Sequence, residues 1–196
     1  MGPRTATPHS ALSLKSVGFL DLFSGKGGVS RAVRARGIQA WEFDVKNGDA
    51  FDLTNSNVLK NIERKISKSM VVACMLAPPC SSFSRARDRT SVIRTAQKPW
   101  GVPKHILSDA DALRVQVGNR CVRAALRMIR ALERHQVPWI LEQPLTRRMW
   151  DLEPFRQLRK QSHIAFESLH QCQYGTRWRK ATDYFAAGWT LSTETV

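Results

Sequence analysis

The sequence predicts a single α/β domain with a mostly parallel β-sheet and helices on both faces. Short apolar runs alternate along the chain with segments whose apolar residues recur at helical spacing, and this alternation is typical of strand–helix–strand units. With 196 residues, 42% of them hydrophobic, the chain is long enough for one domain with a sizeable core. We expect the domain at 17–190 and loose tails at 1–16 and 191–196.

The expected elements follow in a simple order. Buried or alternating apolar runs predict strands within 16–23, 38–45, 70–76, 137–144, 163–175 and 181–189. Helical spacing of apolar residues predicts helices within 24–37, 56–66, 117–135 and 153–161. Residues 85–111 have no clean period and contain Pro, Gly and Trp, so they are expected to form a long basic loop.

The charge of the chain indicates its partner. Lys and Arg number 31 against 16 Asp and Glu, for a net charge of +15, and this excess favours a polyanion such as nucleic acid. No apolar run reaches membrane-spanning length, and 1–16 lack the apolar core of a signal peptide. The four cysteines show no metal-type pairing, so we expect free thiols, no metal, and an intracellular protein of nucleus or cytoplasm, not a secreted one.

A glycine-rich turn in DLFSGKGG joins the first strand to the first helix through Gly25, Gly27 and Gly28. Glycines there let the backbone approach a ligand, while helix-terminal N–H groups point toward it. The second strand ends at Asp44, near the spacing at which an acidic side chain binds a ribose. No Walker pattern accompanies Lys26, so the turn favours a nucleoside cofactor over a triphosphate.

The segment APPCSSFS places Cys80 just after the third strand. Proline cannot donate to a strand ladder, so Pro78 and Pro79 end the apolar run, and parallel sheets hold their chemistry at this edge. Glu142 in ILEQP also ends an apolar strand. A carboxylate there is partly desolvated, which favours proton donation, although a surface or capping glutamate is an equally good interpretation of Glu142 taken alone.

Four segments in this order resemble the cytosine-C5 methyltransferases: DLFSGKGG, APPCSSFS, LEQP and QYGTRWRKAT are similar to the family's first, fourth, sixth and eighth motifs. The Pro–Cys segment is the most specific of them, and the resemblance runs from about Leu20 to Phe185. It implies a Rossmann-like methyltransferase fold, S-adenosylmethionine as methyl donor, and transfer of methyl to C5 of cytosine in nucleic acid, with DNA favoured over RNA.

The resemblance also implies roles for single residues. Cys80 is the nucleophile, next to Pro79, and Glu142 hydrogen-bonds the target ring. The "GN" of VGNR places Asn119 at the start of the family's fifth motif, although the same pair is also similar to the tenth motif. Residues implied to bind the cofactor are Phe23, Gly25, Lys26, Gly28, Asp44, Val45, Asp52 (or Asp49), Leu53 and Asn119. Residues expected to contact nucleic acid are Ser84, Arg85, Arg87, Arg89, Arg94, Arg177, Arg179 and Lys180.

The sequence departs from the family's pattern at two motifs. Gln143 and Pro144 stand where Asn and Val are usual, and the eighth motif has Trp178, Lys180 and Thr182 in place of Gln and two Arg. The chain ends soon after, so a target-recognition region is expected to come from a partner chain if it exists. Two other classes stay open: a degenerate nucleic-acid-binding module, and a cysteine hydrolase that pairs Cys80 with His105 or His163.

Overall fold

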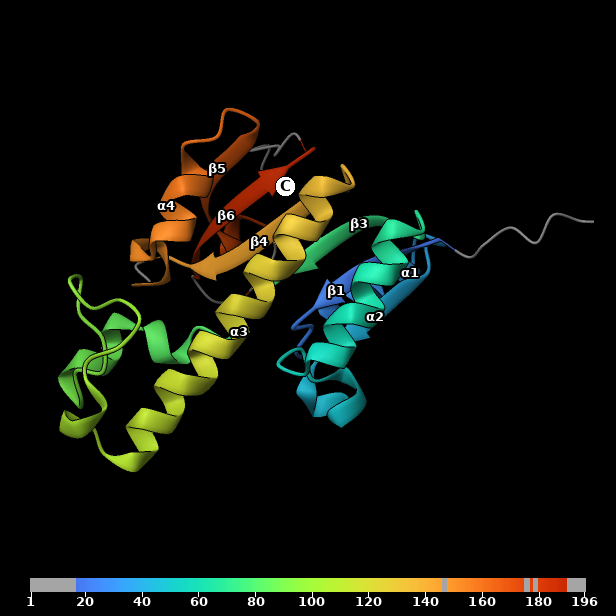
Figure 1. Ribbon diagram of the computed structural model, residues 1–196. Coiled ribbons are helices and arrows are strands. Elements are labelled where there is room, and N and C mark those ends of the chain that lie inside the picture. The colour runs from blue at the N-terminus through green and yellow to red at the C-terminus, as the bar shows by residue number, and fades with distance from the viewer. Residues whose placement is uncertain (1–16, 146–147, 175–176, 178–179, 190–196) are drawn as a thin grey trace, which may run out of the picture.

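The computed structural model describes residues 17–145, 148–174, 177 and 180–189. The expected tails lie outside these residues, and the domain boundaries stay a prediction. Within the described residues, the chain forms a six-stranded sheet in the order β2-β1-β3-β4-β6-β5 (Figure 1). The strands are β1 (Gly18–Leu22), β2 (Ala40–Phe43), β3 (Val71–Leu76), β4 (Trp139–Pro144), β5 (Ile164–His170) and β6 (Ala181–Ala187).

The sheet is mostly parallel and carries helices on both faces, as the sequence predicted. Strands β2, β1, β3 and β4 run parallel, while β6 runs antiparallel to both β4 and β5. The helices are α1 (Gly28–Arg34), α2 (Ser56–Ser67), α3 (Asp109–Arg134) and α4 (Glu153–Arg159). Figure 1 shows α2, α3 and α4 in front of the sheet. Because β2 and β3 flank β1 on opposite sides, right-handed crossovers place α1 on the other face.

One helix is longer than its sequence pattern indicated. The amphipathic period predicted a start at 117, whereas α3 begins at Asp109. The Ser108 side chain caps the helix by accepting from the Asp111 amide at 3.2 Å, and this geometry stabilises a helix N-terminus. Leu113 and Val117 are exposed, so the first turns lack the apolar stripe that a period search needs. The expected basic loop therefore ends at the start of α3.

The core lies between the sheet and the front helices. Alternate residues of the strands point to that side because strand side chains alternate between faces, and they pack against buried residues of α2 and α3. The fully buried members include Leu20, Leu22, Ile62, Leu76, Val122, Trp139 and Leu141. Within the described part of the chain, no helix is long and apolar enough to cross a membrane.

Candidate active site

The order of the strands decides where the motifs meet. From β1 the chain moves to β2 on one side and then to β3 on the other, so the order reverses between β1 and β3. Ligands of open α/β sheets bind at the carboxyl ends of the strands at such a reversal. The glycine turn follows β1, the Cys80 loop follows β3, and Glu142 lies near the end of the neighbouring β4. Motifs more than a hundred residues apart in sequence thus share one edge of the sheet.

The glycine turn has an unusual backbone. Phe23, Gly25 and Gly27 have φ values of 60°, 58° and 66°, a left-handed conformation that glycine adopts freely and phenylalanine does not. The Gly25 amide donates to Asp44 Oδ2 at 2.9 Å, and Asp44 Oδ1 accepts from the Lys46 amide at 3.0 Å. Asp44 therefore connects the ends of β1 and β2. No atom lies within 4 Å of the point where a Gly25 Cβ would stand, so the space beside Gly25 is open.

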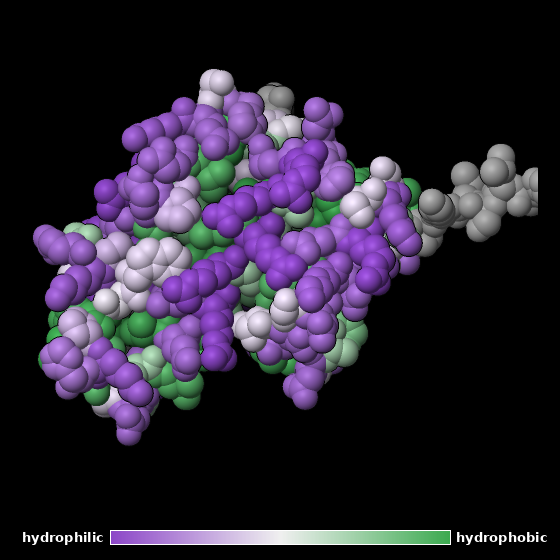
Figure 2. Space-filling model, in the orientation of Figure 1, coloured by the Kyte–Doolittle hydropathy of each residue, from purple (hydrophilic) through white to green (hydrophobic). Residues whose placement is uncertain are grey.

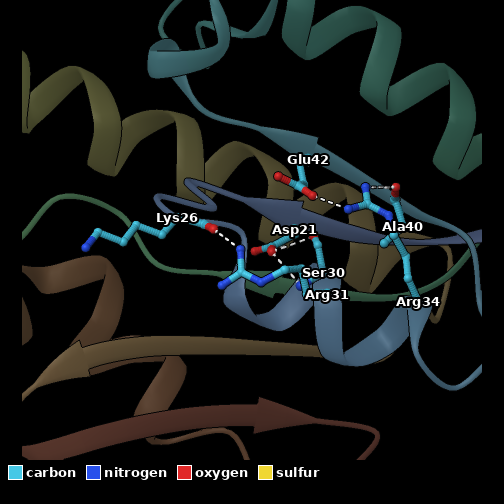
Figure 3. A network of polar contacts seen from close by, with 7 residues as sticks. All are labelled: Asp21, Lys26, Ser30, Arg31, Arg34, Ala40 and Glu42. Carbon is cyan, nitrogen blue, oxygen red and sulfur yellow. Dashed lines mark hydrogen bonds and ion pairs between the residues drawn. The ribbon is translucent and has the colours of Figure 1, made fainter.

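A buried carboxylate, that of Asp21, connects the two elements on either side of the glycine turn, β1 and α1. Asp21 is 2% exposed, and its Oδ2 accepts from the Ser30 amide at 3.1 Å and from Ser30 Oγ at 2.7 Å (Figure 3). Burial raises the pKa of Asp21 above its usual value. Asp21 was not among the expected site residues, although an acid inside an apolar strand was a usable signal.

A second acid that was not among the expected site residues lies beside Gly27. Glu42 pairs with Arg34, and a Cβ on Gly27 would lie 2.6 Å from Glu42 Oε2. The end of this side chain can shift, so the φ of 66° is the stronger reason for glycine at position 27. Figure 3 shows the Lys26 carbonyl accepting from Arg31, while the Lys26 ammonium extends away from the network. A cofactor contact by Lys26 or Gly28 stays a prediction.

The expected adenine side of the site lies near α3. The carboxylate of Asp52 accepts from the amide and the hydroxyl of Thr54 at 2.8 and 2.9 Å. The pKa of Cys121 on α3 rises to about 11 because its thiol is buried, and Asp52 and Asp44 add to the rise. These carboxylates therefore approach α3. Leu53, next to Asp52 in sequence, is buried, so a contact of its side chain with a cofactor stays a prediction.

Exposed side chains complete this region. Val45 is 60% exposed, and Phe51 is 37% exposed and packs on Phe43 with ring centroids 5.9 Å apart. Phe51, between Asp49 and Asp52 in sequence, is thus an available aromatic that sequence reasoning did not select. Phe51 thus offers a ring on the turn next to that of Val45.

Cys80 stands at the start of a short 3₁₀ turn, η3 (Ser81–Phe83), with φ −93° and ψ −8°. Cys80 is partly exposed, whereas Cys74 within β3 and Cys121 within α3 are buried. The buried amide of Gln143 donates to the Pro78 carbonyl, so β4 fixes the loop two residues before the cysteine. Gln143, noted in the sequence as a departure from the family, has this structural role. Pro79 itself is exposed beside Cys80.

Glu142 is paired with a lysine. Lys180 Nζ donates to Glu142 Oε1 at 2.7 Å, with the side chains 38% and 12% exposed. Lys180 was expected to contact nucleic acid; its ammonium lies against this carboxylate and stays partly exposed, so that contact stays a prediction. Thr182, two residues on, is buried and pairs with Pro144 across the strands. The eighth motif therefore lies directly beside the sixth.

The expected phosphate contacts divide into two kinds. Arg85 and Arg89 in η4 (Arg85–Arg89) are exposed, as is Arg177, and Ser84 is partly exposed. The side chains of Arg87 and Arg179 lie outside the described residues. The expectation for Arg94 was wrong: this residue is 1% exposed and donates all its hydrogen bonds to groups of the protein. Asn119 binds Arg94 and the Trp100 carbonyl through its side-chain amide, so its cofactor contact stays a prediction.

Exposed arginines run along α3. Figure 2 shows a band of strongly hydrophilic side chains over this helix, to which Arg120, Arg123, Arg130 and Arg134 contribute. Part of the band is structural, because Arg127 pairs with Glu63 of α2 and Arg123 lies over the Trp100 ring at 5.2 Å. A hollow of about 500 Å³ between α3 and the basic loop is lined in part by Lys104, Gln116, Arg120 and Arg123.

One of the two histidines proposed to act with Cys80 in a hydrolase, His163, does not lie near Cys80. His163 precedes β5, which runs parallel to β3, so it lies at the opposite edge of the sheet from Cys80. Its Nε2 contacts Glu133 Oε2 at 2.7 Å. His105 lies on the basic loop in η5 (Lys104–Ile106) and is exposed.

The residues around the glycine turn can hold a ligand that carries hydroxyl groups. The turn has open space beside Gly25. Residues 17–53 contain five acidic and five basic residues. Among the acidic ones, Asp21 is buried against Ser30 and Glu42 pairs with Arg34, which leaves the carboxylates of Asp44, Asp49 and Asp52. Carboxylates accept hydrogen bonds from hydroxyl groups. This donor set fits the ribose hydroxyls of S-adenosylmethionine.

Comparison with known proteins gives a limited result. No protein-family model and no curated protein matches the chain. Among solved structures, the chain is similar to the Dnmt2 methyltransferase of S. pombe at 13% identity and a TM-score of 0.47, covering 92% of this chain and 52% of that one. It is also similar to the Entamoeba histolytica methyltransferase EhMeth at 14% identity, a TM-score of 0.47, and coverage of 92% and 55%. The chain thus spans about half the length of these structures, and likeness at this level carries no inference about activity.

Proposed function

We propose that this protein transfers a methyl group from S-adenosylmethionine to C5 of cytosine in nucleic acid, with DNA the favoured substrate, through a covalent adduct on Cys80. One observation carries the proposal. The glycine turn, the Cys80 loop and Glu142, which match the family motifs in sequence, follow three neighbouring strands at the edge where the strand order reverses.

The proposed chemistry uses two side chains of this edge. Cytosine C5 is a poor nucleophile, so the Cys80 thiolate adds to C6 and converts the ring into an enamine. The adduct carries a negative charge, which Glu142 stabilises by donating its carboxyl proton to N3; the proton returns to Glu142 when Cys80 leaves. Lys180, 2.7 Å from this carboxyl group, holds the side chain in place. After C5 has been methylated, its proton leaves to a base, and the Cys80–C6 bond breaks with its electron pair returning to sulfur.

The cofactor is proposed to lie beside the glycine turn. Bound S-adenosylmethionine supplies an electrophilic methyl group. Asp44, already fixed by the Gly25 amide, accepts hydrogen bonds from the ribose hydroxyls. Phe23 and Gly28 border the methionine end, and Asp52 with Val45, Leu53 or Phe51 borders the adenine. A base within a duplex is out of reach of such a site, so the target cytosine is flipped out or already unpaired.

Labelled methyl transfer tests the proposal directly. The full chain is incubated with methyl-labelled S-adenosylmethionine and either DNA or RNA, and the products are digested to nucleosides. We expect label in 5-methylcytosine from DNA, and none with a Cys80→Ala variant. Label in another base, or equal transfer by the variant, would refute the assignment. Binding of cofactor and nucleic acid without any transfer would favour the degenerate module instead.

A further inference from the structure

One buried cation connects the nucleophile loop to the rest of the protein. Arg94 Nε donates to the Ser82 carbonyl at 3.0 Å, and Arg94 Nη2 donates to Ser82 Oγ at 3.1 Å. The guanidinium also lies over the Phe83 ring, with its central carbon 3.7 Å from the ring centroid. Ser82 and Phe83 form the η3 turn that Cys80 begins, and the Phe83 amide donates to the Cys80 carbonyl at 3.0 Å. Arg94 therefore grips the turn within two residues of the thiol.

The remaining donors of Arg94 reach the basic loop and α3. Nη1 donates to the Pro99 carbonyl at 2.8 Å and to Asn119 Oδ1 at 2.9 Å, and Nη2 donates to the Val115 carbonyl at 3.2 Å. A guanidinium has five N–H donors in a fixed plane, and all five are used here. The plane of Arg94 thus fixes the mutual orientation of the turn, the loop and the helix.

Helix α3 packs closely against the η3 turn beside Arg94. A Cβ on Gly118 of α3 would lie 2.1 Å from Ser82 Oγ and 3.1 Å from Arg94 Nη2, so the helix approaches the turn at a distance that only glycine allows. The Asn119 amide group donates to the Trp100 carbonyl at 2.7 Å and thereby orients the oxygen that Arg94 uses.

A contribution to folding stability does not by itself explain why a buried arginine stands at position 94. The five acceptors of Arg94 are neutral, and burial lowers the pKa of Arg94 to about 10, so the group stays charged near neutral pH. Burying a charge without an opposite charge is costly, and well-packed apolar residues of similar volume are often at least as stable. What an apolar side chain cannot supply is a rigid set of directed hydrogen bonds to the turn.

We infer that Arg94 is a positioning residue, which holds the η3 turn so that Cys80 meets the target ring in the orientation for attack. The role in attack rests on the proposed function, whereas the bracing of the turn does not. Misplacing a reacting group by about 1 Å lowers rates about a hundredfold. Arg94→Met, which keeps the volume and removes every donor, is therefore expected to lower kcat by about that factor while KM for nucleic acid and Kd for S-adenosylmethionine stay within about twofold.

A matched control makes the same chemical change elsewhere. Arg36 follows α1 at the opposite edge of the sheet and is exposed, so Arg36→Met is expected to leave kcat and KM as in the wild type. Arg94→Lys keeps the charge but not the planar fork, and is expected to recover only part of kcat. Ser82→Ala removes one of the five acceptors and is expected to lower kcat less than Arg94→Met.

A second readout does not depend on methyl transfer. Iodoacetamide labelling of Cys80 is followed by mass spectrometry without cofactor or nucleic acid, with exposed Cys172 as the internal reference. Loss of the hydrogen bonds that hold the turn is expected to change the Cys80 to Cys172 labelling ratio at least about fivefold in Arg94→Met, and in the same direction but less in Ser82→Ala and Arg94→Lys. Those two variants decide the test if Arg94→Met does not fold.

The outcomes separate the two proposals. A wild type that transfers no methyl group contradicts the proposed function, and the labelling ratio still decides whether Arg94 braces the turn. An unchanged ratio in folded variants overturns the inference. So does a kcat that stays at the wild-type value, or a rise in KM that accounts for the whole loss of kcat/KM.

Discussion

Asp44 allows the sharpest test of the proposed cofactor site because its carboxylate has both a structural and a proposed binding role. Oδ2 accepts from the Gly25 amide at 2.9 Å and Oδ1 from the Lys46 amide at 3.0 Å. The same oxygens are proposed to bind the ribose. Asp44→Ala removes all of these contacts, whereas Asp44→Asn removes the charge and keeps one oxygen that can accept from Gly25. Comparing the two variants separates the order of the turn from recognition of the ligand.

The contacts set the expected magnitudes. Each backbone hydrogen bond contributes about 0.5–1.5 kcal/mol, so Asp44→Ala is expected to cost about 1–3 kcal/mol of folding free energy. For a domain of this size, that loss lowers Tm by about 2–12 °C. Charge-assisted hydrogen bonds to the ribose contribute about 1.5–3 kcal/mol each, so cofactor binding is expected to weaken at least about tenfold.

The asparagine variant is expected to behave differently. Its Tm should fall by about 1–6 °C, roughly half the loss in Asp44→Ala, because the Gly25 contact persists and only the Lys46 contact is lost. Its cofactor Kd should still rise about threefold or more, since a neutral acceptor binds hydroxyls less strongly than a charged one. Calorimetry gives Kd and thermal melting gives Tm on the same samples. The cofactor site is misplaced if Asp44→Asn binds as the wild type does, or if the wild type does not bind at all.

Three further predictions address the thiol, the basic loop and the buried acid. An oligonucleotide with 5-fluorocytosine should cross-link to wild type through Cys80 and not to Cys80→Ala, since fluorine at C5 blocks the final elimination; a cross-link at Cys172 would contradict the role of Cys80. Changing Arg85 and Arg89 together to Gln should lower the slope of log K against log salt for duplex DNA by about 2, similarly on all sequences; an unchanged slope would remove both from the interface. The folded pKa of Asp21 is raised above 3.8, so the contribution of this group to folding stability is full below pH 3.8 and falls as pH rises through the raised pKa. The Tm difference between Asp21→Asn and wild type should therefore grow in favour of the variant as pH rises across this window. A Tm difference that does not change with pH would show that Asp21 does not carry this effect.

Several parts of the site followed from local sequence. Gly25 and Gly27 precede a helix and adopt positive φ, which is the freedom that their lack of a Cβ provides. Pro78 and Pro79 end β3 before Cys80, as the missing amide donor of proline requires. These features depend on a few neighbouring residues, so pattern and chemistry were enough to place them.

Long-range contacts were not predictable in the same way. Arg94 stands in the basic loop and was expected to face phosphate, yet it is buried against Ser82, Val115 and Asn119. Lys180 was expected to contact nucleic acid, and only the structure shows that its ammonium binds Glu142 of a neighbouring strand. The identity of a cation's partner depends on which segments fold against each other, and the local sequence around Arg94 or Lys180 does not contain that information.

The sequence by itself determined the order of strands and helices, the α/β class, and the positions of Cys80, Glu142 and the glycine turn at strand ends, because apolar periodicity and the backbone limits of Gly and Pro act locally. Only the tertiary structure decided that β1, β3 and β4 lie side by side, that Gln143 and Arg94 fix the Cys80 loop from two sides, and that Asp44 closes the glycine turn. The physical reason is that a hydrogen bond needs its partners within about 3 Å, and for residues distant in sequence the packing of the whole sheet sets that distance.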